Sequence, residues 1–144
     1  MSLLDANFIE ISLYYRYVAT ESGKRLVILD DVKAQEMMKG DVDNSKSIEQ
    51  LKTKWTLLTW QEQNDVMNVS SQAVNQQTGE RQFNFLAYRD AIVKKCLKEW
   101  NLTANEKPVP VSSEAINKLP GAIVTSLYQK FEGLIDYTEK ELGN

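Results

Sequence analysis

The sequence predicts an α+β protein that is mainly helical, with an N-terminal β-hairpin packed on a bundle of four to five helices. Three observations lead to this fold class. Residues 8–20 alternate between apolar and polar side chains, as a half-buried strand does. Residues 59–102 hold two helical patterns joined by a short polar turn. A wide apolar stripe at helical spacing follows Pro120.

A chain of 144 residues fits one domain. We divide that domain into a β-hairpin at 1–31, a short helical and extended segment at 32–58, a helical hairpin at 59–102 and C-terminal helices at 103–144. The formal net charge of −3 provides no basic field and argues against nucleic acid or anionic lipid as a partner.

The location is expected to be a cytoplasm. No apolar run reaches the roughly 20 residues that span a bilayer, so no membrane contact is predicted. Asp5 and Glu10 stand where a signal peptide needs a basic region followed by an unbroken apolar core. A single cysteine, Cys96, excludes an internal disulfide, and its place on an apolar helix face predicts a core residue.

The N-terminal hairpin is predicted from alternation and a turn. One face of its first strand is apolar and consists of Ile9, Ile11, Leu13, Tyr15 and Tyr17. The turn Glu21–Lys24 separates this strand from a second one at Arg25–Leu29. Asp30 or Asp31 then caps a short helix that ends at Gly40.

Residues 48–58 fit two structures. Ile48, Leu51, Trp55 and Leu58 follow a helical period, whereas the threonine-containing run 52–57 also fits a strand. We favour a short helix followed by an extended approach to the next helix.

The helical hairpin begins at a capping box, because Glu62 follows Thr59 by three residues. The apolar stripe of its first helix contains Trp60, Val66, Met67, Ala73 and Val74. The second helix is predicted to run from the N-cap Asn84 to a stop at Asn101, with one apolar face made of Phe85, Leu86, Ile92, Val93, Cys96, Leu97 and Trp100. A turn containing Gly79 joins the two helices, so they should pack antiparallel. Trp60, Leu97 and Trp100 are expected to share one core.

The C-terminal part is predicted to hold a short helix capped by Ser112 and a longer helix that begins at Pro120. The stripe of the longer helix is the widest in the chain. Our hypothesis is that part of it forms a partner-binding or self-association surface made of Leu127, Tyr128, Phe131, Leu134 and Ile135, with Tyr128 at the rim. The alternative is that this helix closes the intramolecular core.

The sequence carries little that points to chemistry. It has no histidine, no phosphate-binding glycine loop and no dinucleotide fingerprint. Residues 41–45 begin like a calcium loop, but Lys46 and Lys52 occupy positions that need glycine and glutamate. We therefore expect no enzyme, no catalytic residue, no cofactor and no metal. The aromatic run Tyr14–Tyr17 and the set Lys94, Lys95 and Lys98 could contact nucleic acid, but a strand and a solvated helix face explain them better.

From Trp55 onward the chain resembles the small tail assembly chaperones and related morphogenesis proteins of tailed bacteriophages. The residues that carry this resemblance are Lys54–Gln63, Tyr88–Asp90, Leu97–Trp100, Val109–Ser112 and Ile116–Pro120. The resemblance implies a non-enzymatic, helical protein in the host cytoplasm that binds another tail protein, typically the tape-measure protein. It equally leaves open a structural component of the virion tail, baseplate or connector. Self-association is compatible with either function.

Overall fold

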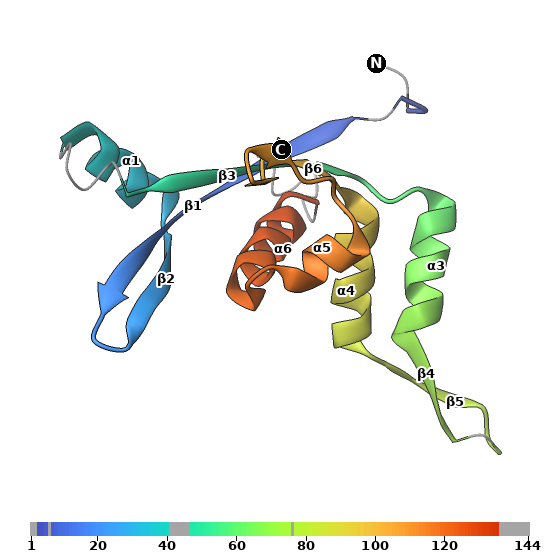
Figure 1. Ribbon diagram of the computed structural model, residues 1–144. Coiled ribbons are helices and arrows are strands. Elements are labelled where there is room, and N and C mark those ends of the chain that lie inside the picture. The colour runs from blue at the N-terminus through green and yellow to red at the C-terminus, as the bar shows by residue number, and fades with distance from the viewer. Residues whose placement is uncertain (1–2, 6, 41–46, 76, 136–144) are drawn as a thin grey trace.

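The computed structural model describes residues 3–5, 7–40, 47–75 and 77–135. Its centre is a four-stranded antiparallel sheet in the order β2-β1-β3-β6. These strands are β1 (Phe8–Thr20), β2 (Gly23–Leu29), β3 (Glu49–Thr56) and β6 (Leu97–Trp100). Figure 1 shows the C-terminal helices packed against one face of this sheet.

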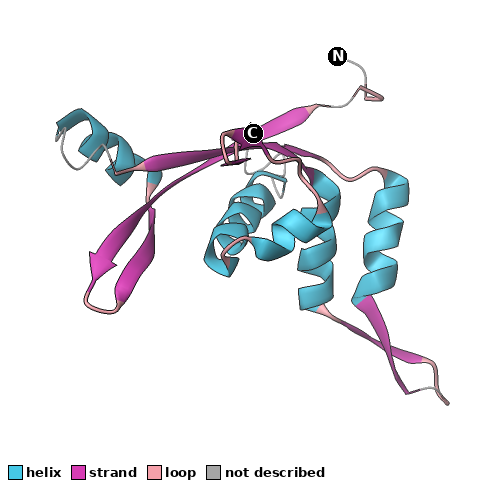
Figure 2. Ribbon diagram, viewed as in Figure 1, coloured by secondary structure: helices cyan, strands magenta, loops and turns pink. Residues whose placement is uncertain are grey.

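The helices are α1 (Asp31–Gly40), α3 (Trp60–Ser70), α4 (Phe85–Cys96), α5 (Ser113–Lys118) and α6 (Gly121–Ile135). A second hairpin of β4 (Ser71–Asn75) and β5 (Glu80–Phe83) lies between α3 and α4, and a small one of β7 (Thr103–Ala104) and β8 (Lys107–Pro108) follows β6. Figure 2 shows that β1–β2 and β4–β5 both project from the body of the molecule.

The helix caps predicted at Asp30, Thr59, Asn84 and Ser112 are confirmed. Thr59 and Glu62 form the capping box at the start of α3, with both hydrogen bonds present. The Asn84 side chain accepts from the Ala87 N–H, and Ser112 caps α5 in the same way. Asp30 Oδ1 accepts from the first backbone N–H groups of α1, including that of Val32 at 3.0 Å. These caps satisfy N–H groups that a helix leaves unpaired.

The fold class predicted from the sequence is wrong. The chain is a mixed structure of helices and strands, and the four-stranded sheet is its organising element. Residues 49–56 form a central strand instead of the short helix that we favoured. The second predicted helix ends at Cys96, and Leu97–Trp100 leaves it to pair with β3. The hairpin at 8–29 is therefore one half of a larger sheet.

The first helix of the predicted pair is also shorter than expected. It ends at Ser70, and the chain continues as β4, so Ala73 lies in a strand. The turn that follows needs a residue with positive φ, which Gly79 supplies at 73°. The connection between α3 and α4 is thus a β-hairpin.

Trp55 occupies the centre of the core. It is completely buried on β3, and its ring stacks on Phe131 of α6 at a centroid distance of 4.7 Å. Its Nε1 donates to Thr53 Oγ1 at 2.7 Å, and that hydroxyl donates to the Ile11 carbonyl at 2.7 Å. The buried Trp55 Nε1 and Thr53 Oγ1 are therefore hydrogen-bonded, while the rings of Trp55 and Phe131 join the sheet to α6.

The shared tryptophan core that we predicted is only partly correct. Leu97 is buried, and Trp100 is half-buried with its Nε1 donating to the Val109 carbonyl at 2.6 Å. Trp60 is 75 % exposed. It stands in the first turn of α3, a helix that buries only Val66 and Ser70. At about 100° per residue, Trp60 and Val66 lie about 120° apart on the helix, so both cannot face the core.

Candidate protein-binding surfaces

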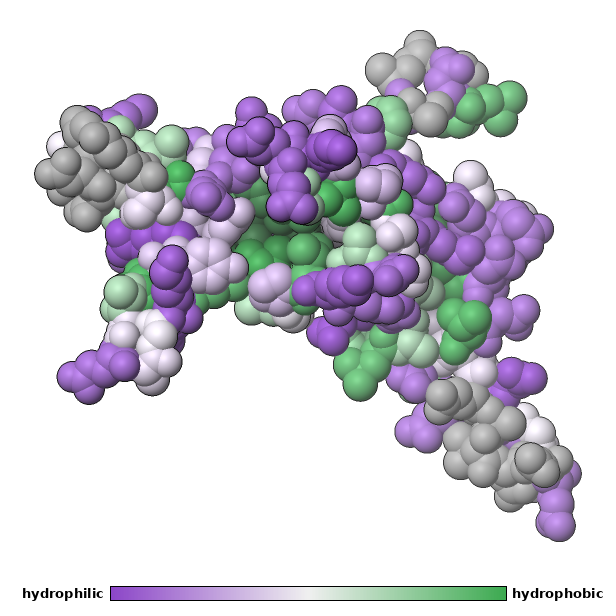
Figure 3. Space-filling view, viewed as in Figure 1, coloured by the Kyte–Doolittle hydropathy of each residue, from purple (hydrophilic) through white to green (hydrophobic). Residues whose placement is uncertain are grey.

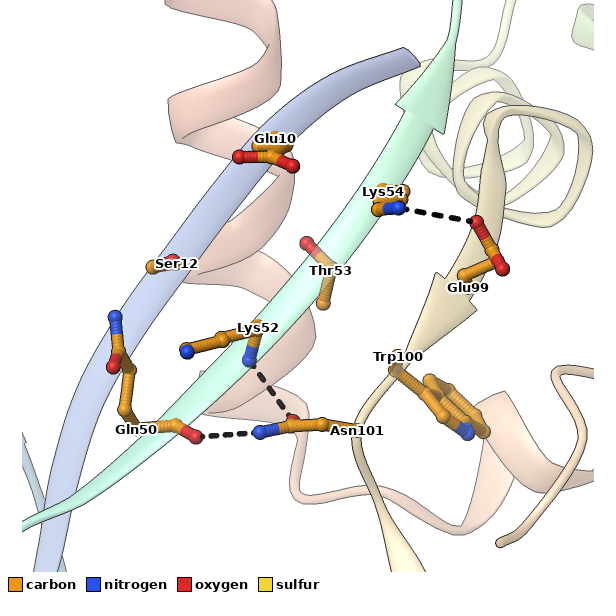
Figure 4. A pocket seen from close by; sticks show the side chains of 9 residues that line it. All are labelled: Glu10, Ser12, Gln50, Lys52, Thr53, Lys54, Glu99, Trp100 and Asn101. Carbon is orange, nitrogen blue, oxygen red and sulfur yellow. Dashed lines mark hydrogen bonds and ion pairs between the residues drawn. The ribbon is translucent and has the colours of Figure 1, made fainter.

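The outer face of the sheet carries a shallow polar hollow (Figure 4). The Asn101 side chain lies at one end of it, accepting from the Lys52 N–H at 2.9 Å and donating to the Gln50 carbonyl at 3.0 Å. Asn101 thus extends the pairing of β3 where β6 ends. Lys54 and Glu99 form an exposed ion pair at 3.9 Å. These contacts describe a solvated sheet face with balanced charges.

The described ranges contain no group of three or more histidine, cysteine, aspartate or glutamate residues that could hold a metal ion. The calcium-like stretch 41–45 lies outside those ranges. None of the helices in the described part of the chain is both long enough and apolar enough to cross a bilayer.

Lys94 and Lys95 make ion pairs within the helical hairpin. Lys94 pairs with Asp90 one turn earlier on α4 at 3.0 Å. Lys95 reaches across to Asp65 on α3 at 3.6 Å. The Lys95–Asp65 pair helps to set the two helices side by side, the Lys94–Asp90 pair lies within α4, and together they account for two members of the basic set.

Cys96 is a core residue, as the sequence predicted. It is 1 % exposed at the end of α4. Burial raises the pKa of its thiol from an ordinary 9.0 to about 12, and the Glu62 carboxylate adds to the shift. Because this folded-state value lies above the unfolded one, the stability it contributes is fully present below pH 9 and declines as the pH rises toward 12.

We expect native Cys96 to react with Ellman's reagent at pH 8 on the order of a thousandfold more slowly than the unfolded chain, because thiolate is the nucleophile and its fraction falls about tenfold per pKa unit. The reaction in buffer and in concentrated urea, followed by absorbance, measures this ratio. Equal rates in the two solutions would show that the thiol is accessible in the folded protein.

The binding surface predicted on the last helix is not available as proposed. Leu127, Tyr128 and Phe131 are at most 4 % exposed and belong to the core. Burial, helped by Glu132, raises the pKa of the Tyr128 phenol to about 12. Only Leu134 and Ile135 remain exposed, at 43 % and 37 %. The alternative, in which this helix closes the core, accounts for the three buried positions, because α6 fills the space beneath β1 and β3.

A different set of apolar side chains is exposed. We name it the α3–α4 apolar surface, and its members are Leu57, Trp60, Met67, Val69, Phe83, Phe85 and Leu86. Trp60 and Leu86 are the most exposed of them, at 75 % and 64 %. Figure 3 shows hydrophobic side chains at the surface over α3 and the start of α4. Single exposed apolar residues are normal, so the informative pair is Trp60 and Met67, which lie seven residues apart and share one face of α3.

A groove adjoins this surface between α4 and the α5–α6 pair. Leu86, Val93, Ile116, Leu119 and Val124 supply its apolar lining. Arg89 and Asp90 stand among the polar residues that line the same groove. An apolar groove with charged residues beside it is the form that receives an amphipathic helix.

Sequence reasoning missed the α3–α4 apolar surface because it assigned Trp60, Phe85 and Leu86 to buried stripes. A signal was present in the helical spacing. Trp60 and Met67 are seven residues apart and share a face that Val66 does not share. Two apolar faces on one short helix indicate that one of them stays exposed in the folded chain.

No protein-family model, curated protein or solved structure matches the chain.

Proposed function

We propose that this chain is a non-enzymatic tail morphogenesis protein of a tailed bacteriophage, and that it acts in the host cytoplasm as an assembly chaperone. Its client is the tape-measure protein or another tail protein. The proposal combines the resemblance to small tail assembly chaperones with the chemistry of the α3–α4 apolar surface.

The observation that carries the proposal is the exposure of Trp60. Tryptophan at the surface is costly in water and is enriched where proteins bind each other. Trp60 and its neighbour Leu57, which is 57 % exposed, both fall in the stretch Lys54–Gln63 that carries the resemblance. The same stretch contains the fully buried Trp55. It therefore supplies the core with one tryptophan and the surface with another.

The client that fits is a chain with amphipathic helices that would aggregate alone. Such a helix presents apolar residues at i, i+3, i+4 and i+7. Trp60 and Met67 offer complementary apolar contacts on one face of α3, and Leu86 offers another beside the groove between α4 and the α5–α6 pair. Covering these side chains removes apolar area from water on both partners, and roughly 25 cal/mol is gained for each Å² of it.

Co-expression with the tape-measure protein encoded in the same genome tests the proposal. We expect the tape-measure protein to be soluble and to co-purify with the wild-type chain. Trp60→Glu should abolish co-purification while leaving the urea midpoint nearly unchanged, because Trp60 makes little use of the core. Leu134→Glu is the matched control, since Leu134 is also exposed but lies outside the α3–α4 apolar surface. Co-purification that survives Trp60→Glu would exclude this surface as the client site.

The second candidate is a structural component of the tail, baseplate or connector. The two projecting hairpins favour it, because such arms suit contacts between subunits of an assembly (Figure 2). Proteomics of purified particles separates the two functions. A chaperone is absent from the finished virion, whereas a structural component is present in fixed stoichiometry.

A further inference from the structure

The strand β1 has an unpaired edge. On one side it pairs with β3 from Phe8↔Thr56 to Tyr15↔Glu49. On the other side, pairing with β2 covers only the stretch from Tyr14 to Thr20. Within the described residues, no strand pairs with Phe8–Leu13 on the β2 side. Such an edge presents N–H and C=O groups that can pair with another strand.

Two hydrogen bonds show which backbone groups face this edge. Thr53 Oγ1 donates to the Ile11 carbonyl at 2.7 Å, so the backbone carbonyl of Ile11 points toward β3. Lys130 Nζ donates to the Ser12 carbonyl at 2.8 Å, and Lys130 lies on α6 beyond the edge. Because the backbone N–H and C=O groups of successive residues point to alternate sides of a strand, those of Phe8, Glu10 and Ser12 point to the unpaired edge. Glu10 and Phe8 therefore offer the backbone groups that a further strand needs.

The edge borders a groove of about 580 Å³ between β1 and α6. Glu10, Ile11 and Ser12 form one wall, and α6 contributes Lys130, Gly133 and Leu134 among the residues of the other. A Cβ atom added at Gly133 would meet nothing within 4 Å, so the helix leaves open space there. In the close view, α6 passes behind β1 and emerges on the side away from β3 (Figure 4).

The hairpin β4–β5 has the complementary strand. A two-stranded ribbon is marginal by itself and is stabilised by joining a larger sheet. Directly after β5, the Asn84 N–H donates to the Ser70 carbonyl at 2.6 Å, so the backbone groups of Gln82, two residues earlier, point toward β4. The backbone N–H and C=O groups of Arg81 and Phe83 then point to the outer edge of the ribbon. All four residues of β5 are exposed.

Register and charge select the pairing. Two β1 edges related by a two-fold axis at Glu10 would place Glu10 opposite Glu10, which is unfavourable. An antiparallel β5 with Arg81 opposite Glu10 places Phe83 opposite Phe8. Both pairs then exchange backbone hydrogen bonds, and their side chains make an ion pair and an aromatic pair.

We propose that β5 of one copy of this chain adds to the unpaired edge of β1 in the next copy, antiparallel, with Arg81 opposite Glu10. The two surfaces are different, so the contact is head-to-tail. Such contacts produce a ring where the rotation closes and a filament where it does not. Phe83 belongs both to the α3–α4 apolar surface and to this pairing, whereas Glu10 and Arg81 lie outside that surface, and the experiments below do not use a client.

Sedimentation velocity of the full chain over a range of concentrations tests the proposal. We expect species heavier than the 16.5 kDa protomer at high concentration. Glu10→Arg and Arg81→Glu should each return the chain to a single protomer, and the double reversal should restore assembly. Glu99→Arg is the control, because Glu99 lies on the same sheet face but away from this edge. A wild-type chain that stays at 16.5 kDa, or a double reversal that does not assemble, would overturn the proposal.

A cross-link provides a second measurement that tolerates weak assembly. Hydrogen-bonded antiparallel pairs have Cα atoms about 5.5 Å apart, within the range that a disulfide spans. Under oxidation, a mixture of Glu10→Cys and Arg81→Cys chains should give a disulfide-linked heterodimer, while each variant alone should not. Buried Cys96 does not compete. A mixture that gives no more cross-linked product than either variant alone would contradict the pairing.

Discussion

Replacing Trp55 with alanine should cost about 3–5 kcal/mol of unfolding free energy, the range for large aromatic residues in a core. Trp55 is completely buried and stacks on Phe131. Its removal leaves a cavity beneath β3 and deprives Thr53 Oγ1 of the hydrogen bond from the indole. Urea unfolding followed by circular dichroism measures the loss, which is a large part of the stability of a typical domain.

The matched control is Trp60→Ala, which removes the same atoms from a residue that is 75 % exposed. This change should alter the unfolding free energy by no more than about 0.5 kcal/mol. The comparison separates the two tryptophans of Lys54–Gln63 by their roles. Similar losses at both positions would mean that Trp60 supports the fold, and the α3–α4 apolar surface would lose its central residue.

The features that the sequence predicted correctly are local ones. The caps at Thr59, Asn84 and Ser112 each involve a side chain and a backbone N–H three residues away. Such bonds depend on neighbours that are fixed by the sequence itself. Strand β1 was predicted at residues 8–20 because its alternation continues over thirteen residues. No distant partner is needed to recognise that period.

The errors arose where a distant partner decides the structure. Residues 49–56 place Leu51, Thr53 and Trp55 inward and Lys52 and Lys54 outward only because β1 and β6 flank them. The apolar residues Leu97 and Trp100 continue the helical period of α4 and gave no sign of a break. Strand pairing stabilises this segment more than one further helical turn would, and that gain lies in contacts with β3, more than forty residues earlier.

The binding surface was misplaced for a related reason. The width of the stripe on α6 was read correctly from the sequence, but a stripe does not identify what covers it. Lys130, on the polar side of the same helix, donates to the Ser12 carbonyl and to both carboxylate oxygens of Asp31. These bonds join α6 to β1 and α1 and help to hold its apolar side beneath the sheet. Exposed apolar side chains remain on α3 and α4, where Trp60, Met67 and Leu86 lie.

The second large effect is expected on α6 itself. Phe131→Ala should cost about 3–5 kcal/mol, because Phe131 is 1 % exposed and packs on the ring of Trp55. Leu134→Ala, three residues later on the same helix, should cost less than about 1 kcal/mol, because 43 % of Leu134 remains exposed. Both variants keep the helix propensity high, since alanine is the best helix former. The difference between them therefore reports tertiary packing.

Urea unfolding of Phe131→Ala, of Leu134→Ala and of the double variant Trp55→Ala/Phe131→Ala measures the losses in unfolding free energy. Residues in contact lose less together than the sum of their separate losses, and stacked aromatic pairs couple by about 0.5–1.5 kcal/mol. A coupling near zero would place the two rings in separate parts of the core. A loss at Leu134 as large as that at Phe131 would show that the exposed end of α6 is also covered in the folded chain, and the groove beside β1 would then be closed to a further strand.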